Sequence, residues 1–182
     1  MPSSADFLEA SGARIRLRAL ETIDVDTLFR WENDPAVWDA GSAHAPFSRR
    51  QLWDYVNSYD GDIFAARQLR LMIVRTDSDE TIGTLDLFDF DPANSRCAVG
   101  IFITPEARGL GFAKEALRSA AYHLRRHLSI HQLYAIVGDD NTPSIALFRA
   151  AGFSDTAIIP DWIRRAGSYI PAHLFTLILK ET

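Results

Sequence analysis

A glycine-rich segment, Arg108–Ala113 (RGLGFA), contains the first residues whose types and spacing suggest chemistry. It follows an apolar run, Val99–Ile103, and precedes an amphipathic pattern from Lys114 to Leu124. The order of strand, glycine loop and helix start leaves backbone N–H groups unpaired at the positive end of the helix. Because glycine lets an anion approach the backbone closely, this loop predicts a phosphate-binding site.

A second segment with the same organisation is Asp139–Phe153 (DDNTPSIALFRAAGF). It follows the apolar run Leu133–Val137, has a proline at a first helical turn and ends on a glycine.

The first loop has neither the Gly-x-Gly-x-x-Gly spacing of a dinucleotide site nor the Gly-Lys-Ser/Thr ending of a P-loop. By itself it is therefore compatible with any phosphorylated ligand, including one held by an unrelated phosphate-binding domain.

The elements that must position these segments follow from hydrophobic periodicity and turn residues. In chain order we expect a strand at Ile15–Leu20, a helix after Glu21 and Thr22, a helix from Ser48, strands at Leu69–Val74, Thr81–Phe88 and Arg96–Ile103, a helix at about Gly109–His127, a strand at Leu133–Val137, a helix from Thr142 to Gly152, and a last strand at Ala172–Leu179. The predicted order is β-αα-βββ-α-β-α-ββ. Because hairpin strands precede βαβ-like pieces, the fold class is α/β (α+β) with a mixed sheet rather than a plain dinucleotide-binding fold.

Composition predicts one domain over residues 1–182, because 182 residues with 47% apolar content suffice for a sizeable core. We expect a cytoplasmic protein, because the sequence has no signal-peptide pattern, no membrane-length apolar run and a single cysteine, Cys97, interpreted as a buried thiol. The net charge of −5 without a Lys/Arg run argues against a nucleic-acid partner, and the lack of a membrane-length apolar run argues against a membrane partner. Residues 1–91 carry −8 and residues 92–182 carry +3, which suggests a cationic ligand for the first half and an anionic one for the second.

The two segments together resemble the GNAT superfamily of acyl-CoA-dependent N-acetyltransferases. The family's CoA loop is matched by Arg108, Gly111 and Ala113, and its second signature by Asn141, Ser144, Leu147, Phe148, Gly152 and Phe153. Looser similarity at Arg30–Pro35 and Arg164–Tyr169 points to the branch with ribosomal-protein N-terminal and spermidine acetyltransferases. The resemblance implies a GNAT-like fold, with a mixed, mostly antiparallel sheet of about seven strands flanked by helices.

The resemblance also implies acetyl-CoA as cosubstrate and a set of residues that hold it. The expected cofactor-binding residues are Ile101, Phe102 and Ile103 beside the pantetheine arm, Arg108, Gly109, Gly111, Phe112, Ala113 and Lys114 at the pyrophosphate, and Asn141, Ser144 and Phe148 in the second segment. Gly100 is expected to mark a bulge or close approach, or alternatively a packing notch. Asn141 has a second interpretation as a helix cap.

The implied reaction is transfer of acetyl to a primary amine by direct attack in a ternary complex. Many family members have a tyrosine acid where this chain has Phe148, which cannot donate a proton. Water, Tyr134 or Tyr169 would then protonate the leaving thiolate; alternatively, the chain binds CoA with little or no catalysis. Asp86, Tyr134 and Asn141 are the candidate catalytic residues.

The expected acceptor is a small amine, a polyamine or a protein N-terminus, bound by Trp31, Glu32 and Asp86. Asp86 stands on an alternating strand, so its alternative interpretation is a solvent-facing carboxylate. The alternative for Glu32 is a surface charge at a helix end. For Trp31, Trp38 and Trp53 the alternative is a position in the core. We expect no metal site: His123 and His127 are spaced by one helical turn without a third ligand. A homodimer is compatible with the resemblance.

Overall fold

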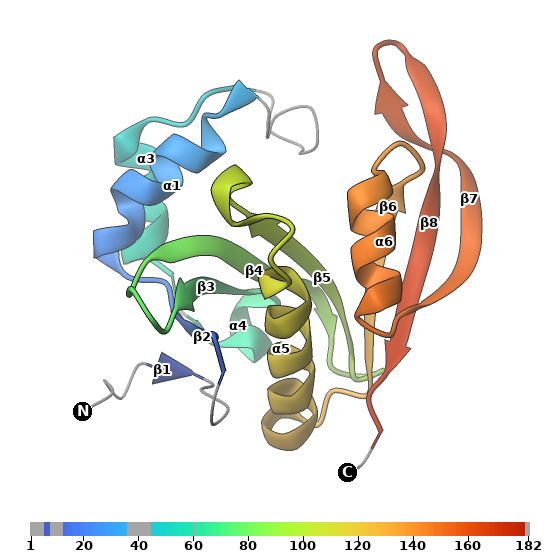
Figure 1. Ribbon diagram of the computed structural model, residues 1–182, viewed down its shortest axis with the longest axis horizontal. Helices are drawn as coiled ribbons and strands as arrows, with labels where there is room; N and C mark the ends of the chain where they lie inside the picture. The colour runs from blue at the N-terminus through green and yellow to red at the C-terminus, as the bar shows by residue number, and fades with distance from the viewer. Residues whose placement is uncertain (1–5, 8–12, 36–44, 60, 181–182) are drawn as a thin grey trace.

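One eight-stranded sheet, with helices on both faces, forms the computed structural model, which describes residues 6–7, 13–35, 45–59 and 61–180 (Figure 1). In chain order the elements are β1 (Asp6–Phe7), β2 (Ile15–Ala19), a 3-10 turn (Thr22–Asp24), α1 (Val25–Glu32), α3 (Arg49–Asn57), α4 (Ile63–Ala66), β3 (Leu69–Arg75), β4 (Thr81–Asp91), β5 (Arg96–Ile103), a 3-10 turn (Pro105–Ala107), α5 (Phe112–Leu128), β6 (Gln132–Gly138), α6 (Thr142–Ala150), β7 (Ser154–Arg165) and β8 (Ser168–Ile178). The strand order is β1-β2-β3-β4-β5-β6-β8-β7, and all neighbours are antiparallel except β5 and β6.

Two apolar clusters, one on each face, hold the layers together. Ile73 on β3 packs in the larger cluster with α5 and α6, whereas its neighbour Met72 packs in the smaller cluster with α1 and α3. Successive residues of a strand point to opposite faces, so β3 is buried on both sides and forms the centre of a three-layer arrangement. The helices therefore fix the position of β3, β4 and β5, the strands that carry the site.

The predicted fold class and element order are confirmed, and most boundaries agree within a few residues. The helix expected from Ser48 begins there through a capping box, in which Ser48 accepts from the Gln51 backbone at 3.1 Å and the Gln51 side chain accepts from the Ser48 backbone at 2.8 Å. The last strand begins at Ser168, earlier than expected, because it pairs with the long β7 in a hairpin. The sequence did not predict β1 or α4, which are too short to show a period.

The expected start of the long helix at Gly109 is wrong by three residues. Gly109 has φ +75° and Gly111 has φ +86°, and both values lie in the left-handed region that an α-helix excludes. The helix α5 therefore begins at Phe112, with Gly111 as its N-cap. The two glycines form a loop in front of the helix instead of its first turn.

Candidate active site

The parallel strands β5 and β6 pair over only part of their length. Their ladder joins Arg96 to Gln132 and ends at the pair Ala98–Tyr134, although β5 continues to Ile103 and β6 to Gly138. Figure 1 shows the two strands diverging beyond this point. Since β4 pairs with the other edge of β5 up to Ile103, the diverging edge offers backbone groups to an extended ligand.

Three predicted cofactor residues, Ile101, Phe102 and Ile103, lie on the diverging part of β5. Ile101 and Phe102 are half-buried and Ile103 is buried. Tyr134 is half-buried at the last β5–β6 pair, where the divergence begins. The structure thus places the candidate acid at the base of the opening and the expected pantetheine strand along one of its sides.

The glycine loop leads directly into α5. Gly111 has no side chain to cap the helix, and the Glu115 N–H donates to the Gly111 carbonyl at 3.2 Å. The N–H groups of Phe112, Ala113 and Lys114 therefore lie in the first turn, where a helix has no carbonyl to accept them. These donors and the helix dipole favour a phosphate at this end.

Two arginines surround the loop, and only Arg108 was predicted. Its Nε donates to the carbonyl of Ile103 at 3.0 Å, which joins the end of β5 to the loop. Arg14, just before β2, donates to the Leu110 carbonyl at 3.1 Å and pairs with Glu115 at 2.9 Å. Arg14 is remote in sequence from the loop and belongs to no motif, so no sequence signal identified it.

The second signature segment forms the start of α6. Asn141 caps the helix, because its Oδ1 accepts the N–H of Ser144 at 3.2 Å. Phe148 is buried, stacks on Phe175 with ring centroids 5.7 Å apart, and meets Phe153 edge to face at 5.1 Å. The helix-cap interpretation of Asn141 is confirmed. The expected cofactor contacts of Asn141, Ser144 and Phe148 remain predictions.

A cavity of about 520 Å³ lies between α1 and the strands β3, β4 and β5. All three predicted acceptor residues line it: Trp31 and Glu32 from α1, and Asp86 from β4. Phe102 is part of the same wall, with its ring centroid 5.2 Å from that of Trp31. Trp53 lies on α3 with 49% of its surface exposed, and Trp38 lies outside the described residues.

Gly100 faces this cavity from the middle of a regular ladder. It pairs with Asp86, and the register irregularity between β4 and β5 falls between Phe88 and Asp91 instead. The expectation of a bulge at Gly100 is therefore wrong. A Cβ there would meet only the Phe88 ring at 3.5 Å, so the absent side chain leaves room above Asp86.

An arginine that the sequence did not single out joins the two acidic residues of the cavity. Arg70 on β3 contacts Glu32 through Nη1 at 2.9 Å and Asp86 through Nε at 2.5 Å. The hydroxyl of Tyr59 accepts its backbone N–H, and the ring of Tyr55 lies 5.8 Å from its guanidinium carbon. Burial opposes the charge of Arg70, but attraction to the two carboxylates outweighs it and raises the pKa of Arg70.

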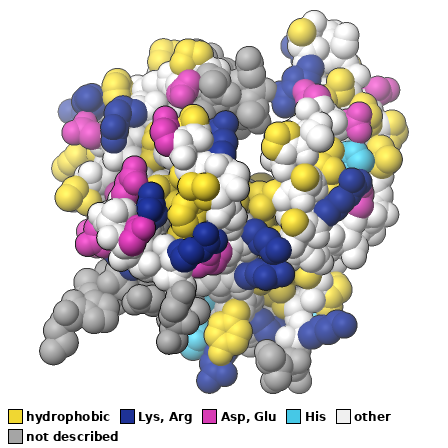
Figure 2. Space-filling model, in the orientation of Figure 1, with side chains coloured by type: hydrophobic (Ala, Val, Ile, Leu, Met, Phe, Trp, Pro, Cys, Tyr) yellow, Lys and Arg dark blue, Asp and Glu magenta, His cyan; other side chains and the backbone are white. Residues whose placement is uncertain are grey.

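The surface is hollowed between the part that carries β2–β5 and the part that carries β6–β8, and Lys and Arg side chains gather below this hollow over α5 (Figure 2).

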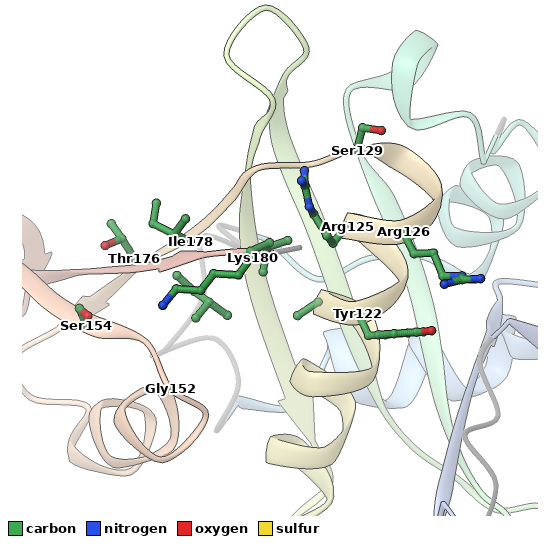
Figure 3. A pocket seen from close by; sticks show the side chains of 12 residues that line it. Tyr122, Arg125, Arg126, Ser129, Gly152, Ser154, Thr176, Ile178 and Lys180 are labelled. Atoms are coloured by element: carbon green, nitrogen blue, oxygen red, sulfur yellow. The ribbon is translucent and has the colours of Figure 1, made fainter. Parts of the chain in front are cut away.

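A second cavity, of about 1130 Å³, lies away from the predicted residues, between the C-terminal half of α5 and β8 (Figure 3). Arg125 and Arg126 line it from α5, and Lys180 from the chain after β8. Its described lining contains no carboxylate for an ammonium group, so the smaller cavity is the better acceptor site.

No helix among the described residues is long and apolar enough to cross a membrane. Within the same ranges, no group of three or more His, Cys, Asp and Glu side chains is arranged to hold a metal. His123 and His127 lie against each other with ring centroids 4.4 Å apart.

Comparison with known proteins adds the family. The acetyltransferase (GNAT) domain family matches residues 14–154, which include the glycine loop and the whole second signature. The chain belongs to the GNAT acetyltransferases. It is therefore an acetyl-CoA-dependent N-acetyltransferase, and the predicted family, enzyme class and cosubstrate are confirmed.

Individual relatives agree with this assignment. The chain is 28% identical to an uncharacterized N-acetyltransferase, p20, of Bacillus licheniformis, over 92% of this chain and 94% of the relative. It is 26% identical to the spermidine N(1)-acetyltransferase of Escherichia coli strain K12, over 79% and 75% of the two chains. The fold is shared with the spermidine N-acetyltransferase of Vibrio cholerae, solved with CoA and spermine, at a TM-score of 0.81, 20% identity and coverage of 91% and 96%.

Proposed function

We propose that this GNAT acetyltransferase moves the acetyl group to a primary amine that enters the cavity beside Glu32 and Asp86. The observation that carries the proposal is a shared wall. Ile101 and Phe102 line the acceptor cavity and also lie on the diverging part of β5, where the pantetheine arm is expected. Amine and thioester would then meet across one strand without a covalent enzyme intermediate.

The acceptor assignment rests on charge as well as on position. Glu32 and Asp86 are both acidic, and they line the cavity from two different elements, α1 and β4. Carboxylates favour an ammonium group, which then has to lose a proton before its nitrogen can attack. Spermidine acetyltransferases among the relatives support an amine acceptor, with polyamines as one class to test.

The chemical step can be written from residues near the opening. The neutral amine nitrogen attacks the thioester carbon, and a backbone N–H at Ile103 or a neighbour stabilises the oxygen of the tetrahedral intermediate. The C–S bond then breaks, the CoA thiolate takes a proton, and the nitrogen loses its remaining excess proton to solvent, through water next to Asp86. We assign the proton for the thiolate to Tyr134, which lies at the last β5–β6 pair, where the two strands diverge.

Burial raises the pKa of Tyr134, so its hydroxyl is protonated at neutral pH, as a tyrosine hydroxyl ordinarily is. The other tyrosine considered from the sequence, Tyr169, is 60% exposed at the start of β8 in the β7–β8 hairpin. Figure 1 shows this hairpin projecting away from the point where β5 and β6 diverge. We therefore assign the acid role to Tyr134 and none to Tyr169.

Release of free CoA thiol from acetyl-CoA, measured across a panel of monoamines, diamines, spermidine and a peptide with an open N-terminus, tests the proposal. We expect release with at least one amine. In Asp86→Asn we expect kcat/KM to fall at least about tenfold, since a hydrogen bond to a charged partner contributes about 1.5–3 kcal/mol. Asp54→Asn, at a half-exposed position of α3, is the matched control. CoA binding without release for any amine would instead identify a CoA-binding protein without turnover, as the buried Phe148 would then explain.

A further inference from the structure

The acceptor cavity contains a built-in cation. Among the described residues that line it, the charged side chains are Glu32, Asp86 and Arg70. Two carboxylates and one guanidinium leave a net charge of −1. The charge available to a bound ammonium group is therefore half of what the two acidic residues alone would offer.

Arg70 is held in place from several directions. Its Nη1 and Nε contact different carboxylates, so the guanidinium bridges α1 and β4. Its backbone N–H donates to the Tyr59 hydroxyl, and its side chain is only 22% exposed. A planar guanidinium held at two edges loses much of its freedom to leave the site, so it acts as a fixed counter-ion.

The register of the sheet explains why this arginine faces the acidic pair. Arg70 on β3 lies directly opposite Asp86 on β4, and Asp86 lies directly opposite Gly100 on β5. Side chains of residues paired in this way point to the same face of the sheet. Arg70 thus approaches Asp86 from one side, and the missing side chain of Gly100 leaves the other side open to a ligand.

The rest of the wall is mostly apolar. Leu28, Trp31, Phe88, Ile101 and Phe102 line the same cavity. A first ammonium group brings the site to neutrality, whereas a second one inside the cavity would leave an uncompensated positive charge next to Arg70. In surroundings of low polarity such a charge is costly.

We propose that Arg70 is a specificity-determining residue that makes this cavity select amines with one positive charge on an apolar body over polyamines. The inference rests on the proposed acceptor site and names its substrate class: alkyl or arylalkyl monoamines. A polyamine would bind with one ammonium group beside Asp86 and would have to keep its other charges outside the cavity.

The test compares two acceptors of equal length, hexylamine and 1,6-diaminohexane, which differ by one terminal ammonium group. In the unmodified protein we expect kcat/KM to be about tenfold or more higher for hexylamine, because of the uncompensated second charge. In Arg70→Gln the cavity has a net charge of −2, and this ratio should fall about tenfold or more. Arg70→Lys keeps the charge and should keep the preference for the monoamine.

Two further variants make the result interpretable. Arg50→Gln removes an arginine from the exposed surface of α3, where its side chain is 85% exposed, and should leave the ratio unchanged. Glu32→Gln brings the cavity to a net charge of zero, so the ratio should rise, opposite to Arg70→Gln. This variant also keeps the test valid if Arg70→Gln does not fold, which a thermal melt would show.

The outcomes separate the two levels of the argument. Turnover of both amines with a ratio that does not move in Arg70→Gln and Glu32→Gln would overturn the role of Arg70 and leave the acetyltransferase proposal standing. Absence of thiol release with every amine in the unmodified protein would reject the proposed function, and the inference with it. A wild-type preference for the diamine would also overturn the inference.

Discussion

Asp86 on β4 and Gly100 on β5 form a cross-strand pair in which only one partner has a side chain. The pair lies in a regular antiparallel ladder, and both residues line the acceptor cavity. Because Gly100 has no Cβ, the space above the Asp86 carboxylate stays open on the side away from Arg70. The cavity therefore exists partly because of a missing side chain, which makes it easy to fill by substitution.

Gly100→Leu should impair acceptor binding without unfolding the protein. The new Cβ would meet only the Phe88 ring, at an ordinary contact distance of 3.5 Å, and the rest of the side chain would enter the cavity. We expect kcat/KM for the amine to fall at least about tenfold, because the new side chain fills space that the amine would occupy, with unchanged affinity for CoA. Steady-state kinetics with varied amine, together with binding of CoA, measures both quantities.

Gly83→Ala is the contrasting control for this substitution. Its Cβ would lie 2.1 Å from the Phe102 carbonyl oxygen, a backbone atom that cannot turn aside. We expect a loss of about 1–3 kcal/mol in the free energy of unfolding, measured by denaturant titration. If Gly100→Leu destabilised the protein as much as Gly83→Ala, the interpretation of Gly100 as a cavity-forming residue would be wrong.

Gly111→Glu should abolish CoA binding. The position has φ +86°, and its Cβ would lie 3.3 Å from Nη2 of Arg14, at the N-terminus of α5. A carboxylate there repels a phosphate and covers the N–H groups that would bind it. We therefore expect the affinity for CoA to be at least about 100-fold weaker. Calorimetric titration with CoA measures the effect.

Gly167→Glu provides the matched control, because Gly167 has a nearly equal φ of +89° in the β7–β8 hairpin and its Cβ would have no neighbour within 4 Å. Both variants bear the cost of a left-handed non-glycine residue, about 1–2 kcal/mol. Equal CoA affinity in the two variants would reject the glycine loop as the phosphate site.

Local patterns predicted the cofactor half of the site, because its residues are continuous in sequence. The segment Arg108–Lys114 contains its own strand end, loop and helix start, so its geometry follows from glycine conformations and helix capping. The segment from Asn141 to Ser144 is equally local, since the cap bond joins residues three positions apart. The helix start was misplaced, because composition alone does not show which glycines adopt positive φ, and Arg14 was missed because it is remote in sequence from the loop.

The acceptor half depends on register, which the sequence did not fix. Trp31, Glu32 and Asp86 were each predicted for the acceptor, and the structure brings them to one cavity. Arg70 was missed because its role follows from pairing with Asp86 across the β3–β4 hairpin. That ladder shifts between Ile73 and Val74, so counting outward from the turn at 76–80 does not give the partner.

Tyr134→Phe should slow acetyl transfer while leaving acetyl-CoA binding intact. Tyr134 lies at the last β5–β6 pair, and loss of its hydroxyl removes the proton donor that we assign to the leaving thiolate. General acid catalysis contributes about 10²–10⁴-fold, so kcat should fall by about 100-fold or more, with little change in KM for acetyl-CoA. Tyr169→Phe, at the exposed hairpin position, should behave as the unmodified protein. Unchanged kcat in Tyr134→Phe would assign the proton to water.

His173 should make the stability of the β6–β8 region depend on pH. It is buried on β8, with Nε2 2.9 Å from Asp139 and Nδ1 3.0 Å from Asp155, and Asp155 also pairs with Arg149. Hydrogen bonds to Asp139 and Asp155 raise the pKa of His173 above 6.5. A raised folded-state pKa means that the stabilisation is fully present below the unfolded-state pKa and is lost as pH rises through the folded-state value.

The measurement is the difference in Tm between the unmodified protein and His173→Gln across pH 5 to 9. We expect this difference to be largest at about pH 5–6, where His173 is charged in both states, and to shrink as pH rises through the raised pKa of His173. His131→Gln, at an exposed position just before β6, is the control for the loss of a histidine. A difference that stays constant or grows with pH would mean that His173 is neutral in the folded protein and that its two aspartates do not hold it as a cation.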